Sequence, residues 1–207
     1  GEPSNHTMDA FFGTNGDRRF YIQGYLNYER SFGLHNVSGM LLYNQDDYNT
    51  NVNSSLIASL PKRKMGVAAR LSYDYDHRYM LEVNAGYNGS ESFAKGHRWG
   101  LFPSVALAWK LNEESFLKNV NAISDLKLRL GYGVTGQQNL GNGDYPYMAR
   151  YMYSKAGANY YFGDTEYSLI APQPYDQNLK WEETTTWNVG IDYGFLNGRI
   201  TGTIDYY

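Results

Sequence analysis

Apolar and polar residues alternate along most of the chain, which predicts β-strands. In residues 65–75 the odd positions are apolar or aromatic and the even positions are small or charged. Successive side chains of a strand point to opposite faces of its sheet, so this segment has one apolar and one polar face. The same alternation recurs in residues 20–28, 37–43, 79–88, 104–111, 126–134, 186–193 and 199–206. The chain is therefore predicted to be all-β, an antiparallel up-and-down meander of about eight strands.

The connections between these strands are predicted to alternate in length. Short turns follow Glu29, Tyr75 and Leu196, and the last contains an Asn-Gly pair, which is typical of a type I′ hairpin turn. A short helix over residues 113–123, with acidic residues in its first turn, makes the fourth connection on that side. Longer polar loops occupy residues 45–63, 89–100 and 136–178. Short turns at one rim and long loops at the other are typical of an outer-membrane barrel.

The average composition conceals this pattern. A mean hydropathy of −0.58 indicates a water-soluble protein, and there is no apolar run of about 20 residues to predict a membrane helix. A membrane β-barrel gives a weaker signal, because lipid-facing apolar positions alternate with polar ones. The chain is thus predicted to be a segment of a larger transmembrane β-barrel, with Trp109, Leu128 and Ile191 facing lipid. The predicted lumen-facing residues are Arg70, Glu82, Lys127 and Arg129. A soluble β-sandwich would also alternate, but the Tyr and Trp residues near the ends of the apolar faces favour membrane girdles.

Few residues offer other chemistry. The net charge of −3 provides no basic patch for nucleic acid, and the absence of cysteine excludes disulfides and thiolate sites. Residues 131–136 match G-x-G-x-x-G, but no helix can follow, so small glycines in a crowded barrel interior explain the match better than a nucleotide site. Asp47, Asn49, Asn51 and Asn53 have calcium-loop spacing without the Gly and Glu of an EF-hand, which leaves an irregular calcium site open. The four histidines are scattered, and no catalytic constellation or cofactor site is predicted.

Aromatic residues in the predicted loops are the remaining functional signal. Exposed aromatic side chains stack on sugar rings or anchor a protein partner. The candidate contacts with substrate or partner are Trp99, Tyr145, Tyr147, Tyr151 and Tyr161. The alternative is that these loops simply pack on each other.

Four strings, in order along the chain, resemble the SusC/RagA-like TonB-dependent transporters of Bacteroidetes outer membranes. They are RLSYDYDHRYML (70–81), WGLFPSVALAW (99–109), LKLRLGYGVTGQ (126–137), and NLKWEETTT (178–186) followed by GIDY (190–193). The resemblance covers residues 66–207, whereas the earlier residues fit the family only by their alternation.

The resemblance implies a nutrient importer with a barrel of about 22 strands around a plug. It further implies a SusD-like surface lipoprotein, TonB as the source of energy, and oligosaccharides or peptides as substrates, in a Gram-negative outer membrane. On this basis residues 1–16 are an N-terminal tail or an artificial end of the chain. Residues 17–207 are a partial barrel that lacks the plug, and no enzyme activity is expected. The alternatives are a complete eight-stranded structural barrel or adhesin, and a soluble aromatic-rich module that binds carbohydrate.

Overall fold

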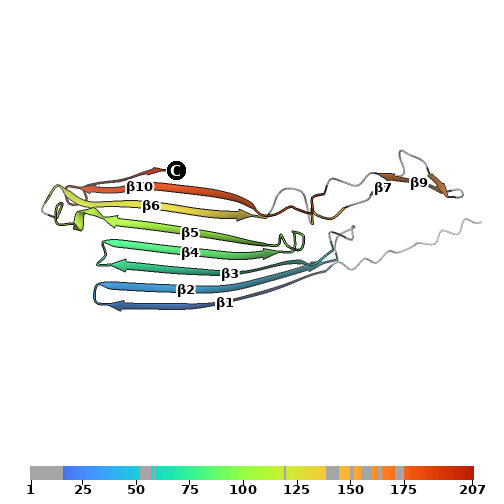
Figure 1. Cartoon of the computed structure of the whole chain (residues 1–207), viewed down its shortest axis with the longest axis horizontal. Coiled ribbons are helices and arrows are strands. Elements are labelled where there is room, and N and C mark those ends of the chain that lie inside the picture. The colour runs from blue at the N-terminus through green and yellow to red at the C-terminus, as the bar shows by residue number, and fades with distance from the viewer. Residues whose placement is uncertain are drawn as a thin grey trace, which may run out of the picture.

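The computed structural model describes residues 16–51, 57, 59–118, 120–138, 145–149, 152–154, 160–162, 165–170 and 175–207. Eight long strands form one antiparallel sheet, in the order β1-β2-β3-β4-β5-β6-β10-β11 (Figure 1). They are β1 (Asp17–Phe32), β2 (His35–Thr50), β3 (Lys62–Tyr75), β4 (Tyr79–Ser90), β5 (Trp99–Lys110), β6 (Ile123–Gln137), β10 (Glu182–Phe195) and β11 (Ile200–Tyr206). The predicted eight-stranded meander is confirmed. The predicted N-terminal tail lies outside the described residues except for Gly16.

The sheet is open, because β1 and β11 form its two edges and do not pair with each other. A closed eight-stranded barrel is therefore not what this chain forms, and a single long sheet is not a sandwich of two. Between β6 and β10 lie three short strands, β7 (Met152–Ser154), β8 (Tyr160–Phe162) and β9 (Thr165–Ile170), which pair in the order β7-β9-β8. Among the described residues, no helix is long and apolar enough to cross a membrane.

The two rims of the sheet differ less than predicted. At the left of Figure 1, turns of two to four residues join β1 to β2, β3 to β4 and β10 to β11, and residues 111–122 join β5 to β6. At the opposite edge the connections are residues 51–61, 91–98 and 138–181. We call the first edge the short-turn rim and the second the long-connection rim. Asp76 and His77 adopt positive φ between β3 and β4, and Leu196, Asn197 and Gly198 do so between β10 and β11. The Asn-Gly pair thus lies in a turn, but Phe195 pairs with Ile200, so the turn is longer than the predicted two-residue type I′.

One predicted helix and the start of one predicted loop were wrong. The described part of residues 113–123 contains no α-helix; a 3₁₀ turn at Leu111–Glu113 is followed by further turns. No side chain caps this turn, and so short a segment gains little from intrahelical bonds. The predicted loop at 45–63 is also shorter, because β2 continues to Thr50. Cross-strand ion pairs of Asp46 with Arg19 (2.8 Å) and Asp47 with Arg63 (2.9 Å) sustain the pairing beyond the apolar band.

Residues that pair directly across neighbouring strands are mostly of the same polarity. One row of directly paired residues runs Tyr28, Gly39, Leu71, Val83, Val105, Tyr132 and Trp187, from β1 to β10. The adjacent row, displaced by one residue, contains Met40, Arg70, Asn84, Ser104, Gly133 and Thr186. Because neighbouring residues of a strand point to opposite sides, the sheet has an apolar face, containing the first row, and a polar face, containing the second.

The apolar face is largely uncovered. Leu26 is 72% exposed, Leu101 58% and Leu71 51%. Phe93, in the β4–β5 connection, is the one side chain of the described residues with less than 2% exposure. Contiguous exposed apolar surface of this extent requires a covering partner or an apolar solvent.

Candidate functional site

The four charged residues predicted to face a lumen all lie on the polar face, in two groups. In the first group, Arg70 on β3 donates from Nε to Oδ1 of Asn84 (3.1 Å), and Asn84 donates from Nδ2 to Oε1 of Glu82 (2.8 Å). Ser72 approaches the second carboxylate oxygen of Glu82 at 3.4 Å. Asn84 thus connects a cation and an anion that the strand spacing holds apart. The exposure of this face to a lumen stays a prediction.

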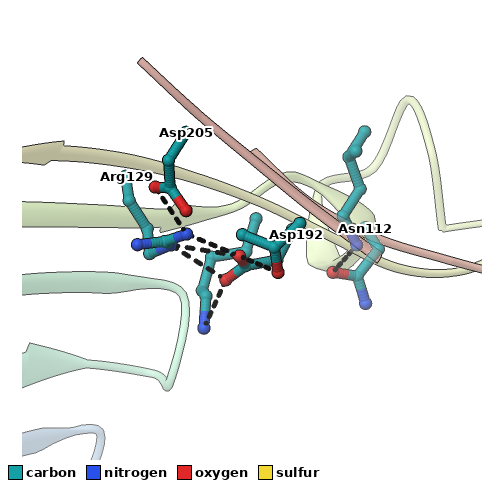
Figure 2. A network of polar contacts seen from close by, with 7 residues as sticks. Asn112, Arg129, Asp192 and Asp205 are labelled. Atoms are coloured by element: carbon teal, nitrogen blue, oxygen red, sulfur yellow. Dashed lines mark hydrogen bonds and ion pairs between the residues drawn. The ribbon is translucent and has the colours of Figure 1, made fainter. Parts of the chain in front are cut away.

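The second group is an ion network across β6, β10 and β11 (Figure 2). Arg129 donates to both oxygens of Asp192 (2.9–3.1 Å) and to Oδ1 of Asp205 (3.0 Å), while Nζ of Lys127 lies 3.1 Å from Asp192. Thr203 adds a hydrogen bond to Asp192 (3.1 Å). Two cations and two anions are therefore balanced within one cluster, and charge-assisted bidentate bonds of this kind are strong and directional.

Gly190 makes the long reach of Arg129 possible. It pairs with Arg129 on one side and with Asp205 on the other. A Cβ at Gly190 would lie 2.4 Å from Oδ1 of Asp205 and 2.9 Å from Cζ of Arg129. The guanidinium thus crosses over the glycine to reach the third strand.

A hollow of about 620 Å³ lies on the polar face, toward the short-turn rim. Its lining comes from the neighbouring strands β1 to β6 and β10 and their turns, and includes Asn36, Asp74, Glu82, Arg129 and Asn188. Residues from strands so far apart in the sheet line one hollow only where this face is concave. A polar, concave face suits contact with water or with another polar part of a protein.

Three aromatic residues form a small core on the polar side of the long-connection rim; we call them the aromatic cluster. Trp181 lies 5.3 Å, between ring centroids, from both Phe93 and Phe102. The indole Nε1 of Trp181 donates to the carbonyl of Arg98 (3.0 Å). The cluster thus ties the end of the long connection before β10 to the β4–β5 connection.

Glycines provide the space for this cluster. A Cβ at Gly136 would lie 2.0 Å from the Phe102 ring, and one at Gly100 would lie 2.4 Å from it. The aromatic cluster is not evident from the sequence pattern, because its members belong to three different segments. The available signal was Gly100, two residues before Phe102 and thus on the same face of β5, because a glycine beside a large residue leaves room for its ring over the backbone.

The aromatic residues predicted as substrate or partner contacts are dispersed. Trp99 lies on the apolar face and stacks on Tyr87, with ring centroids 4.8 Å apart and planes 13° apart. Tyr145 is only 5% exposed, and its hydroxyl donates to the carbonyl of Pro61. Tyr147 packs edge-on against Tyr145 at 6.2 Å. Tyr151 and the side chain of Tyr161 lie outside the described part of the structure. Contact of these residues with substrate or partner stays a prediction.

The polar segment with calcium-loop spacing is mostly strand. Asp47 accepts hydrogen bonds from Asn49 (2.6 Å) and Arg63 (2.9 Å). Asn53 lies outside the described residues, and the ranges that the structure describes contain no group of three or more His, Asp or Glu side chains that could hold a metal.

Aromatic residues line both ends of the apolar face. Toward the short-turn rim, Tyr79 stacks on Trp109 (6.2 Å), and toward the long-connection rim Tyr87 stacks on Trp99. Glu114 accepts hydrogen bonds from the Tyr79 hydroxyl (2.5 Å) and from the Trp109 indole (3.1 Å). These two bonds lower the pKa of the Glu114 carboxyl, the bond from Tyr79 contributing most. Tyr and Trp at such positions are typical of membrane–water interfaces.

Comparison with known proteins assigns the architecture. The family model for the TonB-dependent receptor-like β-barrel matches residues 3–207. The TonB-dependent receptor SusC of Bacteroides thetaiotaomicron is 46% identical over 175 residues, 84% of this chain. This chain belongs to the TonB-dependent receptor β-barrel family. The TonB-dependent receptor P39 of Formosa agariphila is 29% identical over 98% of the chain.

Solved structures give the same fold. The structure of the RagAB peptide transporter superimposes with a TM-score of 0.73 over 91% of this chain, at 20% sequence identity. The chain spans 17% of SusC, 18% of P39 and 23% of that RagAB chain. The open eight-stranded sheet is therefore the counterpart of part of a larger barrel.

Proposed function

We propose that the chain forms part of the barrel wall of an outer-membrane, TonB-dependent nutrient importer. One observation carries this proposal: the continuous apolar face is bounded at both ends by aromatic pairs. On β5, Trp109 follows Trp99 by ten positions. At about 3.4 Å per residue this is about 34 Å along the strand, or roughly 25 Å once the strand tilts by about 40°, which matches the apolar band of an outer-membrane barrel.

In this proposal each rim and each face of the sheet has a defined environment. Outer-membrane barrels have short periplasmic turns and long extracellular loops, so the short-turn rim faces the periplasm and the long-connection rim the exterior. The polar face, with Arg70, Glu82, Lys127 and Arg129, lines the lumen. There it meets water or a plug supplied by another segment of the full receptor.

The similarity to the relatives supports a proposal for the partners and substrates. The 46% identity to SusC and the fold of the RagAB peptide transporter favour an importer that works with a SusD-like lipoprotein and TonB. Its substrates are oligosaccharides or peptides. The connection between β6 and β10 starts and ends at the long-connection rim, where the aromatic cluster holds its end, and such a lipoprotein would close over the barrel at this rim. The role of this segment is geometric and not catalytic.

The face assignment is tested by nitroxide scanning of β5 in the full-length receptor. The chain has no cysteine of its own, so once any cysteines in the rest of the receptor are replaced, single cysteines at Ser104 through Ala108 report their own positions. Val105 and Leu107 are expected to be accessible to lipid-soluble oxygen. Ser104, Ala106 and Ala108 are expected to be shielded from it. Loss of this period of two would contradict the membrane orientation.

Transport is tested by deleting the gene of the full receptor and supplying oligosaccharides or peptides as the nutrient source. Loss of growth on one class, with growth on its monomers retained, is expected. Co-purification of a surface lipoprotein with the tagged receptor tests the partner. Unchanged growth on both classes would contradict the import function while leaving the barrel assignment intact.

A further inference from the structure

A small hollow lies on the apolar-face side of the long-connection rim. Its volume is about 170 Å³, several times the roughly 30 Å³ that a water molecule occupies. Its lower wall is a row of directly paired residues, Gln45, Met65, Gly89 and Trp99, across β2 to β5. Gly89 leaves the row open in the middle, and the Trp99 ring lies over it, within 2.9 Å of where a Cβ would stand.

The upper wall of the hollow is charged. Beyond the apolar row, residues of alternating sign follow one another along the rim. Arg63 lies 2.9 Å from Asp47 and 3.9 Å from Glu91, and Arg98 lies 3.5 Å from Glu91. The lower wall includes the apolar side chains of Met65 and Trp99. The hollow is lined by three cations, Arg63, Lys64 and Arg98, and one anion, Glu91, which suits an amphiphile with an anionic headgroup.

The two guanidinium groups retain hydrogen-bonding capacity. Each has five N–H donors. Among the described residues, Arg63 makes one short bond, from Nε to Asp47, and Arg98 makes one of 3.2 Å, from Nε to the carbonyl of Phe93. Their distances to Glu91 are at or beyond the limit of a hydrogen bond. The Nη groups are therefore available to the oxygens of a phosphate, which guanidinium groups bind in a forked geometry.

We propose that this hollow binds the phosphate group of a phosphorylated glycolipid in the outer leaflet. Arg63 and Arg98 hold the phosphate, and Met65 and the Tyr87–Trp99 pair support the sugar and the first carbons of the acyl chains. The occupant follows from charge complementarity and from continuity of the hollow with the apolar face. This inference rests on the proposed orientation, in which the long-connection rim meets the exterior leaflet.

The test uses the full-length receptor, with lipid A carrying both phosphates as the probe. Native mass spectrometry measures the fraction of receptor that retains lipid. The double variant Arg63→Gln/Arg98→Gln is expected to retain at least ten-fold less lipid A than the wild type. Arg19→Gln is the matched control, because Arg19 pairs with Asp46 at the same rim but on the polar face. It is expected to retain lipid A within two-fold of wild type.

Two further probes identify the ligand. The wild type is expected to retain at least ten-fold less dephosphorylated than phosphorylated lipid A, and to lose phosphorylated lipid A as salt is raised, because ions screen exposed charges. Equal retention of the dephosphorylated form, or of phosphatidylglycerol, would overturn the phosphorylated-glycolipid assignment. So would equal retention by the double variant. These wild-type comparisons decide the matter even where the double variant does not fold.

Failure of this lipid site can be distinguished from failure of the proposed membrane function. Folded barrels migrate anomalously on unheated gels, so gel mobility reports whether the receptor is a barrel. An intact barrel without selective lipid retention refutes this site alone. A receptor that neither inserts into vesicles nor shows the mobility shift refutes the membrane orientation itself.

Discussion

The two faces of the sheet carry side chains of opposite character on the same backbone. On the apolar face, large residues such as Leu26 and Val105 keep 72% and 36% of their surface exposed. On the polar face, side chains are joined by hydrogen bonds and ion pairs that cross two or three strands, as in the Arg129 network. In water, exposure of the apolar face would have the higher free-energy cost.

This contrast indicates how each face is stabilised. The apolar face gains its stability from whatever covers it, because its residues bury little of each other. The polar face is organised from within, by pairs such as Arg129 and Asp192 and by the aromatic cluster at the long-connection rim. A substitution is therefore expected to have different effects on the two faces.

Charge insertion should give the largest difference between the faces. Val105 lies six residues from Trp99 and four from Trp109, near the middle of the apolar band. Val105→Arg is expected to cost about 2–4 kcal/mol of folding free energy in lipid, as charges do at the bilayer midplane. The neighbouring Ala106→Arg, on the polar face opposite Glu82, is expected to cost less than about 1 kcal/mol. Guanidinium titration of the full receptor in vesicles measures both.

Leu128→Arg tests how the cost of an inserted charge depends on its depth in the apolar band. Leu128 pairs with Trp109, at the aromatic end of the band and not at its middle. Its substitution is therefore expected to cost only about 0–1 kcal/mol. Equal costs at Val105 and Ala106 would show that the two faces do not differ in their surroundings.

The aromatic cluster should be the next most sensitive feature. Gly136→Ala places a Cβ 2.0 Å from the Phe102 ring, which packs against Trp181. Overpacking of this kind is expected to cost about 1–3 kcal/mol. The control is Gly24→Ala on β1, where nothing lies within 4 Å of the added atom. In a Phe102→Leu background the cost of Gly136→Ala should largely disappear; if it persists, backbone strain and not the ring is responsible.

Alternation and the turn signals together were sufficient to predict the eight-stranded sheet, its strand order and its two faces. Each strand pairs with the next predicted strand, so a period of two and the turn signals determined the topology. Arg70, Glu82, Lys127 and Arg129 were assigned to one face for the same reason, and the register places them there. The periodicity therefore predicts on which face of the sheet a residue lies.

Contacts between distant segments could not be predicted in this way. The aromatic cluster joins residues 93, 102 and 181, and Arg129 reaches Asp205 across Gly190. Both depend on register and on the absence of a Cβ, which alternation does not specify. The mistaken helix at 113–123 has a related cause: the acidic start at Glu114 resembles a helix N-terminus, but its carboxylate bonds to Tyr79 and Trp109 instead.

On the polar face, Gly190→Ala should have a smaller effect than Gly136→Ala. Its Cβ meets the ends of two flexible side chains, Arg129 and Asp205, which are each about one-third exposed. We expect loss of the Arg129–Asp205 pair at a cost of about 1 kcal/mol or less, reduced further in high salt. In an Asp205→Asn background the same substitution should cost less. An undiminished cost there would show that the glycine is needed for strand geometry and not for the passage of the guanidinium.

The smallest effect is expected at the short-turn rim, where Glu114 joins the aromatic end of the apolar face. Its pKa is lowered in the folded protein, chiefly by the hydrogen bond from Tyr79, from an ordinary value of 4.5. The stabilisation is therefore present above pH 4.5 and is lost as the pH falls through the lower, folded pKa. Wild type and Glu114→Gln should differ in melting temperature at pH 7 and converge at acidic pH. Tyr79→Phe should weaken this pH dependence. If the difference between wild type and Glu114→Gln does not change with pH, the carboxylate acts through shape alone, and the rim would contribute no electrostatic stabilisation to the apolar face.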